Sequence, residues 1–291
     1  MPSLKKHFSS YIIVIISAFW SCSKNNDTPS GGGNAGSGNN EGTDCVVTTI
    51  SQVNSGAGSE SSLSAFYNSS YEVTKLIVYD SINKAKNFEA NFNYITTDSV
   101  RIGQYQYILL DNNKRITRFV TKSHFSDPEH GDNYVFEYTY NSEGYLATKN
   151  LFINGSTLAN FSTTYSYTSE RLTGCVMTTP SSGNLKVLEA ILSYDNSVNI
   201  KNWMYTFPDA IEGYQYLTVL NFGKHVSNPL KKVVTQVYEP AMGNLIDTWI
   251  TNYGNYKIDG NGFVLSGEAT GDLQQGIAAF YGKTNFYYAC H

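Results

Sequence analysis

The sequence lacks the features that mark helical membrane proteins and nucleic-acid-binding proteins. Its main apolar stretch, residues 11–20, is far shorter than the roughly 20 residues that a membrane-spanning helix needs. The net charge is only −4, and no basic patch indicates a nucleic-acid partner. Only 7 residues are proline, whereas 23 are tyrosine and 15 are phenylalanine, and helical periodicity is absent after residue 45. This composition favours pleated, half-buried strands.

Motifs of catalysis and of metal binding are also missing. No G-x-S-x-G, H-E-x-x-H or paired C-x-x-C pattern occurs. The densest polar cluster, residues 124–132, could offer imidazole and carboxylate ligands, but Pro128 and Gly131 make it typical of a hairpin connection. We therefore predict no enzymatic activity, no catalytic residues, no cofactor and no metal. A hydrolase that uses His124 or His130 is the alternative.

The first residues have the order of an export signal. Lys5 and Lys6 precede the apolar stretch, and Cys22 follows it directly after a small residue. We predict a lipoprotein signal peptide over residues 1–21, with lipid attachment at Cys22. The alternative is ordinary signal-peptide cleavage, in which Cys22 is incidental.

Residues 22–44 carry almost no large apolar side chains and are rich in glycine, asparagine and serine. Such a segment cannot bury a core and behaves as a flexible coil that reaches roughly 25 Å. We interpret it as a tether that holds the following residues, 45–291, clear of the membrane. Those residues are predicted to form one all-β repeat domain.

Three cysteines lie within the predicted domain: Cys45, Cys175 and Cys290. A disulfide between Cys45 and Cys290 would join the two ends of the domain, and an oxidising envelope permits it. Three cysteines cannot all pair within one chain. The alternative is that all three are small buried residues.

A short pattern recurs, in which an aromatic or aliphatic residue precedes Asp, Asn or Thr and a polar turn. It occurs at Tyr79-Asp80, Leu110-Asp111, Tyr140-Asn141, Tyr167-Thr168, Tyr194-Asp195 and Ile258-Asp259. The first five positions lie 27 to 31 residues apart, and the gap of 64 before the last leaves room for a divergent unit around residues 221–224. Each unit predicts one β-hairpin.

Aromatic residues alternate along the predicted strands. Tyr134, Phe136 and Tyr138 share one face, and Val135 and Glu137 share the other. Six or seven hairpins imply about 12–14 antiparallel strands. Because so wide a sheet must twist, curl or close, we predict an all-β fold in which successive hairpins form a half-barrel or barrel-like sheet.

The segment 138–146, Tyr-x-Tyr-Asn-x-x-Gly-x-Leu, resembles the YD repeat of RHS-type proteins. With its signal peptide and the sequence Ser-Cys-Ser-Lys-Asn-Asn-Asp around Cys22, the chain resembles Bacteroidetes lipoproteins built from such repeats, to which no activity is assigned. In that group, acidic residues just after the cysteine favour the cell surface, and here Asp27 alone is acidic within five positions. The resemblance implies an outer-membrane lipoprotein at the cell surface or the periplasmic face.

These observations predict a lipid-anchored outer-membrane protein that acts as a non-catalytic binding module. Its partners would be the membrane, through Cys22, and a glycan, protein or lipid ligand. Trp203, Trp249 and the many tyrosines could stack on sugar rings; the alternative is that they pack within the sheet. One alternative is a carrier of an apolar ligand in an open aromatic trough. Another is a transmembrane β-barrel, which requires a lipid-facing aliphatic band, whereas tyrosine here is spread along the strands.

Overall fold

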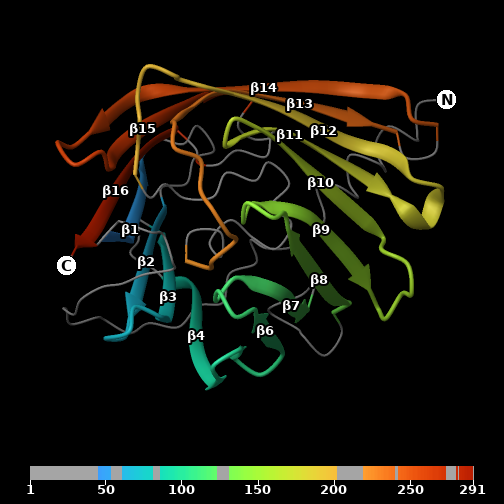
Figure 1. Cartoon of the computed structure of the whole chain (residues 1–291), viewed down its shortest axis with the longest axis horizontal. Coiled ribbons are helices and arrows are strands. Elements are labelled where there is room, and N and C mark those ends of the chain that lie inside the picture. The colour runs from blue at the N-terminus through green and yellow to red at the C-terminus, as the bar shows by residue number, and fades with distance from the viewer. Residues whose placement is uncertain are drawn as a thin grey trace.

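Sixteen antiparallel strands form one sheet that closes on itself (Figure 1). The structure is a computed structural model and describes residues 45–53, 61–80, 86–122, 131–201, 219–239, 242–272, 280 and 282–290. The strands are β1 Cys45–Val53, β2 Ser61–Tyr67, β3 Val73–Asp80, β4 Lys86–Thr96, β5 Ser99–Ile102, β6 Gln106–Leu110, β7 Ile116–Lys122, β8 Asn133–Tyr140, β9 Leu146–Ile153, β10 Phe161–Thr168, β11 Arg171–Thr179, β12 Leu185–Tyr194, β13 Leu230–Tyr238, β14 Leu245–Ile258, β15 Val264–Gly271 and β16 Gly282–Cys290. Each strand pairs with the next in sequence, and β1 pairs with β16, so the wall of the barrel is continuous.

The predicted all-β fold of successive hairpins is confirmed, and the sheet takes the fully closed form. The strand count is sixteen rather than about 12–14, because several strands carry no copy of the repeated pattern. Strands β1 and β2 precede the first copy of the predicted pattern, β16 follows the last, and the turn between β4 and β5 carries no copy. Across the described residues, no helix has the length and apolar character needed to cross a membrane.

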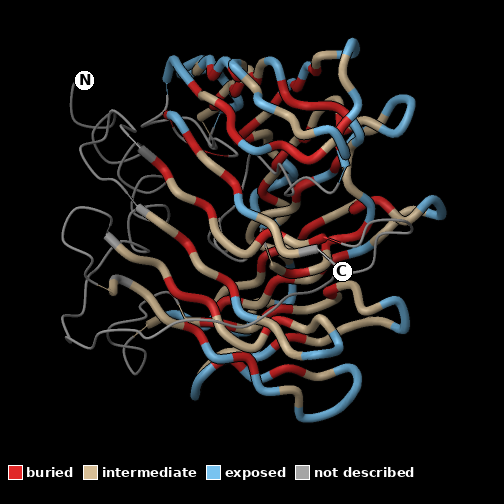
Figure 2. The backbone as a smooth tube through the Cα atoms, turned by 90° about the vertical axis from the view of Figure 1, so that its left-hand side faces the viewer, coloured by how far each residue is buried: buried red, intermediate tan, exposed pale blue. Residues whose placement is uncertain are grey.

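The core lies on the inner face of the barrel wall. Phe119, Phe136 and Leu151 are register partners on β7, β8 and β9, and each is at most 2% exposed. The rings of Phe119 and Phe136 stack with their centroids 6.0 Å apart. Burying side chains of this size stabilises the fold by about 1.5–3 kcal/mol each. Figure 2 shows the buried residues recurring along the strands while the turns are exposed.

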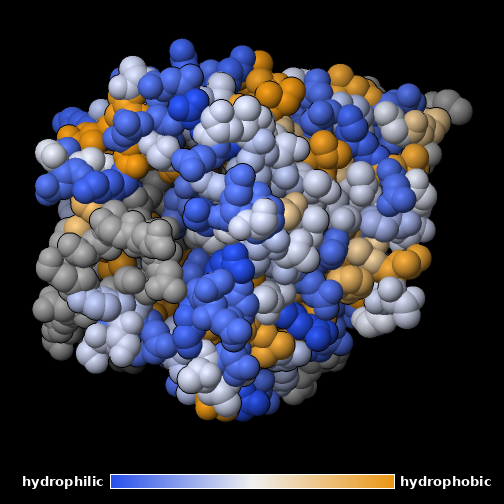
Figure 3. All heavy atoms as spheres, viewed as in Figure 1, coloured by the Kyte–Doolittle hydropathy of each residue, from blue (hydrophilic) through white to orange (hydrophobic). Residues whose placement is uncertain are grey.

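The outer face of the wall carries a series of polar and charged pairs. Cross-strand pairs follow one another around it: Lys75–Glu89 at 2.9 Å, Arg118–Glu137 at 3.9 Å, Thr139–Thr148 at 2.7 Å, Ser162–Asn150 at 2.7 Å, Tyr238–Glu189 at 3.2 Å and Asn255–Glu268 at 2.7 Å. Hydrophilic residues predominate on the side of the molecule seen in Figure 3, and hydrophobic ones occur there in small groups. The apolar core therefore lies inside the wall, and the outer face combines these polar pairs with exposed apolar side chains such as Ile191, Ile250 and Leu265.

Tyrosine hydroxyl groups tie neighbouring strands together at one end of the barrel. The hydroxyls of Tyr67, Tyr140, Tyr194, Tyr256 and Tyr288 donate to the backbone carbonyls of Val47, Ile116, Leu172, Leu230 and Val264, at 2.6–2.9 Å. Each acceptor lies on the strand that precedes the tyrosine. Burial raises the pKa of the Tyr140 and Tyr256 hydroxyls above the ordinary value. These tyrosines therefore stay protonated and can donate.

The first and last strands meet at the closure of the sheet. Cys45 and Cys290 are register partners there. Directly opposed residues of an antiparallel pair have Cα atoms about 4.5–5.5 Å apart, which a disulfide can bridge. The register therefore suits the predicted Cys45–Cys290 disulfide, which stays a prediction because the side chain of Cys290 lies outside the described side chains. Cys175 is buried and takes part in no disulfide.

Candidate functional site

Hairpins at one end of the barrel share a turn that is capped by a side chain. In the turn between β8 and β9, Asn141 Oδ1 accepts hydrogen bonds from the backbone N–H groups of Glu143 (3.1 Å) and Tyr145 (2.9 Å). Gly144 adopts a φ of 92° there. The same capping occurs in the turns that begin at Asn68, Asp111 and Asp259. The repeated Asp or Asn thus stabilises its own turn, and we call this end of the barrel the capped end.

The structure shifts the start of the repeat. Tyr79-Asp80, the first copy in the sequence pattern, ends β3 and so lies at the opposite end of the barrel. The first capped turn begins at Asn68, directly after Tyr67 at the end of β2. The signal that could have revealed it is the same aromatic-Asn pair, Tyr67-Asn68.

The gap in the repeat contains a strap, residues 219–229, in place of a further hairpin within the described residues. Asn221 Oδ1 still accepts from the Gly223 N–H at 2.9 Å, so the capped turn persists. The strap then bonds to several hairpins in succession: Asn221 O with Ile116 N (2.9 Å), Lys224 N with Gly144 O (3.0 Å), Asn228 Oδ1 with Arg171 Nε (2.7 Å) and Pro229 O with Asp195 N (2.9 Å). Figure 1 shows this segment, in orange, within the ring of strands.

Two glycines allow the strap to lie directly on a hairpin turn. A Cβ on Gly223 would come within 2.3 Å of the Gly144 carbonyl oxygen, and Gly223 has a φ of 91°. Only glycine fits such a close approach without displacing backbone. Next to this contact, the Phe222 ring is fully buried against Tyr138, with centroids 5.3 Å apart. The strap therefore has a fixed position, and Lys224 follows directly.

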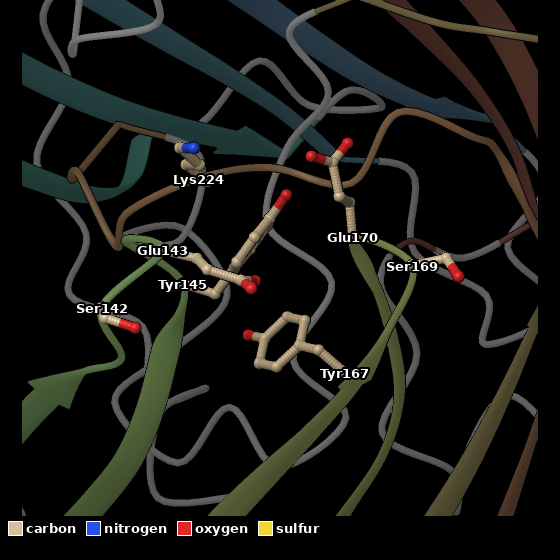
Figure 4. Close-up of a pocket in the computed structure, with 7 residues that line it drawn as sticks. All are labelled: Ser142, Glu143, Tyr145, Tyr167, Ser169, Glu170 and Lys224. Atoms are coloured by element: carbon tan, nitrogen blue, oxygen red, sulfur yellow. The ribbon is translucent and has the colours of Figure 1, made fainter.

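A pocket of about 480 Å³ opens beside this contact at the capped end. Its lining comes from the β8/β9 turn, the end of β10 with the turn that follows, and the strap: Ser142, Glu143, Tyr145, Tyr167, Ser169, Glu170 and Lys224. Figure 4 shows Lys224 and Glu170 on one side of the two tyrosine rings, with the Tyr167 hydroxyl directed toward Glu143 and Tyr145. The pocket thus combines two carboxylates, one ammonium group, two phenols and two hydroxyls.

The two tyrosines form the floor of the pocket. The rings of Tyr145 and Tyr167 lie 4.9 Å apart between centroids, tilted by 34°. The pKa of the Tyr145 hydroxyl is raised, first by burial and then by the nearby carboxylates of Glu170 and Glu143. Lys224 Nζ lies 5.8 Å from the centre of the Tyr145 ring. The floor therefore presents protonated hydroxyls, with charges of both signs around it.

The turn that carries Glu170 is strained. Ser169 and Glu170 have φ values of 49° and 64°, so both lie in the left-handed region. Asparagine and glycine are usual at both central positions of such a two-residue hairpin turn. Unfavourable backbone of this kind gathers at functional sites, which makes this wall of the pocket a candidate for function.

Most residues that the sequence singled out lie elsewhere. Cys22, the 1–21 and 22–44 segments, His124, His130 and Trp203 are outside the described residues. Trp249 belongs to β14, away from the pocket, and its indole N–H has no hydrogen-bond partner within the described part of the chain. Within that part, no group of three His, Cys, Asp or Glu side chains could hold a metal ion. The pocket residues Tyr145 and Tyr167 belong to the repeat, but no sequence pattern links them to Lys224.

The comparisons with known proteins extend only to the fold. No family model matches the chain and no curated protein is similar, so the resemblance to lipoproteins with YD repeats gains no support. Two crystal structures of porin-like proteins are similar. The one from Bacteroides uniformis ATCC 8492 has a TM-score of 0.57 and 12% identity and covers 84% of this chain and 96% of its own. The one from Bacteroides vulgatus ATCC 8482 has a TM-score of 0.54 and 12% identity, and the match covers 84% of this chain and 98% of the other. The chain therefore shares the fold of two porin-like barrels.

Proposed function

We propose that the protein is a non-catalytic binding module of the outer membrane, held by a lipid on Cys22 with its barrel outside the bilayer. The polarity of the wall carries this proposal. Cross-strand pairs such as Lys75–Glu89 and Arg118–Glu137 lie on the outer face. A charged side chain on the lipid-facing surface of a barrel costs about 2–4 kcal/mol near the bilayer midplane. The part of the outer face that carries these pairs therefore favours water over acyl chains.

The outer membrane is supported by the two similar barrels, which are described as porin-like proteins of Bacteroides. A porin has a polar, water-filled lumen and an apolar outer band. Here the inner face holds an apolar core, which includes Phe119, Phe136 and Leu151, alongside buried polar side chains such as Lys149 and Thr163. We therefore adopt the location that the similar barrels suggest but not a channel function. The predicted signal peptide, lipid attachment and tether supply the attachment instead.

The binding function rests on the pocket at the capped end. The pocket brings together groups from three segments, and its volume falls in the range of about 300–1,000 Å³ that is usual for ligand sites. Its lining is polar apart from the tyrosine rings. The alternative of an apolar-ligand carrier gains no supporting feature from the described residues, and we do not adopt it.

Membrane fractionation of a Cys22→Ala variant tests the proposal. The wild-type protein should stay with the membranes during an alkaline carbonate wash, because acyl chains hold it there. Cys22→Ala should leave the membrane fraction, whereas the matched variant Ser23→Ala should stay. If Cys22→Ala resists the wash and needs detergent for extraction, the barrel itself is embedded and the proposal is wrong.

A further inference from the structure

We infer that the pocket at the capped end binds a neutral saccharide. This inference deepens the proposed binding function and rests on it. Every sugar hydroxyl is both a donor and an acceptor of hydrogen bonds. The pocket offers both kinds of partner, because Glu143 and Glu170 accept, the ammonium group of Lys224 donates, and the phenols of Tyr145 and Tyr167 do either.

The charges of the pocket favour a neutral ligand over an ion. A cationic ligand would be expected over the face of an aromatic ring, but Lys224 Nζ already lies on that side of Tyr145, 5.8 Å from the ring centre. An anionic ligand would be repelled by Glu143 and Glu170, the two carboxylates that raise the pKa of the Tyr145 hydroxyl. A neutral molecule with several hydroxyl groups can donate hydrogen bonds to the two carboxylates and accept one from the ammonium group of Lys224.

The pocket is a built site because independent constraints fix its walls. The strap is held against the β8/β9 turn by the Lys224 N to Gly144 O bond of 3.0 Å and by the close Gly144–Gly223 approach. The opposite wall is the strained turn that carries Glu170. Below them, Tyr145 is 3% exposed and packs on Tyr167, which fixes the floor. Preorganised polar groups of this kind bind with a smaller loss of conformational entropy.

Calorimetry on the mature lipidated chain in detergent tests the inference, with neutral trisaccharides of glucose, galactose, mannose and xylose as probes. We expect saturable binding of at least one probe. The variants Glu170→Gln and Lys224→Met should each raise its Kd by about tenfold or more, the effect of losing one hydrogen bond to a charged group. The control Thr164→Ala, on the exposed outer face of β10, should leave the Kd unchanged.

Ionic strength separates the ligand classes. Saccharide binding should change less than about twofold between 0.05 and 0.5 M NaCl, because the ligand carries no charge to be screened. Methylguanidinium serves as the cationic probe, and saturable binding of it that weakens with salt and depends on Glu143 and Glu170 would overturn the inference. So would saccharide binding that neither variant weakens, or no binding of any trisaccharide.

A second position tests how Lys224 is held. Gly223→Ala should displace the strap and raise the Kd about as much as Lys224→Met, while Lys224→Arg should retain part of the affinity.

Two further outcomes separate the inference from the proposed function. Cleavage of a bound trisaccharide, detected as new reducing ends, would support the inference yet contradict the non-catalytic function. Loss of saccharide binding with unchanged Cys22-dependent attachment would overturn the inference alone.

Discussion

The two faces of the barrel wall differ in polarity although they are built from the same strands. On β7 to β9, one row of register partners points inward: Phe119, Phe136 and Leu151. The neighbouring row on β7 to β10 points outward: Arg118, Glu137, Asn150 and Ser162. Successive residues of a strand face opposite sides, so one step along the chain separates the core from the solvent-facing surface. On these four strands the arrangement is the reverse of that in a membrane barrel, in which the aliphatic side chains face outward.

The largest effect is expected from a change on the inner face. Phe136→Ala removes a fully buried ring that stacks on Phe119. We expect the free energy of unfolding to fall by about 3–5 kcal/mol, because the substitution loses apolar contacts and leaves a cavity. Denaturant titration measures it. Glu137→Ala, one residue further on the outer face, should cost less than about 1 kcal/mol; equal losses at the two positions would contradict the comparison.

A smaller effect is expected from an inner-face hydrogen bond. Tyr194→Phe keeps the ring but removes the hydroxyl that donates to the Leu172 carbonyl at 2.9 Å in a buried setting. We expect a loss of about 1–2 kcal/mol, since a buried carbonyl loses its donor. Thermal unfolding measures the change. On the outer face, Tyr287→Phe is the control, because that side chain is 54% exposed, and it should be neutral; a neutral Tyr194→Phe would show that the bond does not stabilise the barrel.

The contrast between the faces is local, and for that reason the sequence predicts it. Alternation in a segment such as 134–138 needs only neighbouring residues to show which side chains share a face. The repeated Asp or Asn could be recognised for a similar reason, since it caps the turn that follows it, as Asp259 does for the N–H groups of Asn261 and Phe263. Hairpins and the all-β class therefore follow from short-range rules.

The closure of the sheet and the path of the strap could not be predicted, because they depend on contacts between distant residues. The pairing of β1 with β16 requires the register of all sixteen strands to add up to a closed ring. The strap occupies the gap of the repeat, where Asn221 keeps its capping bond but no strand follows within the described residues before Leu230. A repeat pattern alone cannot distinguish a divergent hairpin from such a segment.

The candidate site was missed for the same reason. Tyr145 and Tyr167 could be placed in strands or turns, but not beside Lys224, which is distant in sequence and held there by Gly144 and Gly223. The sequence marks Trp203, Trp249 and the many tyrosines alike as residues that could stack on sugars, so it does not single out Tyr145 and Tyr167. The available signal was the pair Gly223-Lys224 in the divergent unit of the repeat. Only the contact between Gly223 and Gly144 in the folded chain shows that this pair places Lys224 beside Tyr145.

On the outer face, acidification should remove a small stabilisation. Lys75 and Lys86 hydrogen bond to the Glu89 carboxylate and lower its pKa from the ordinary 4.5 to about 2. Because the folded pKa is the lower one, the stabilisation is complete above about pH 4.5 and disappears as the pH falls toward 2. We expect Glu89→Gln to cost about 0.2–1 kcal/mol at pH 6 and nothing at pH 2. Unfolding titrations across this range measure the difference, and the cost of Thr164→Ala should not vary with pH.

The smallest effect decides most directly whether the outer face meets water or lipid. Ile191 is 52% exposed on β12, and its register partner on β13 is Val234, which in turn pairs with Ile250 on β14. In water, Ile191→Lys should change the free energy of unfolding by no more than about 0.5 kcal/mol. In contact with acyl chains it would cost about 2–4 kcal/mol. Its neighbour Ala190 is 1% exposed on the inner face, so Ala190→Lys should prevent folding in either case and shows that the assay detects a buried charge. If Ile191→Lys leaves the free energy of unfolding unchanged and Ala190→Lys does not fold, the outer face at Ile191 contacts water and the inner face at Ala190 belongs to the core.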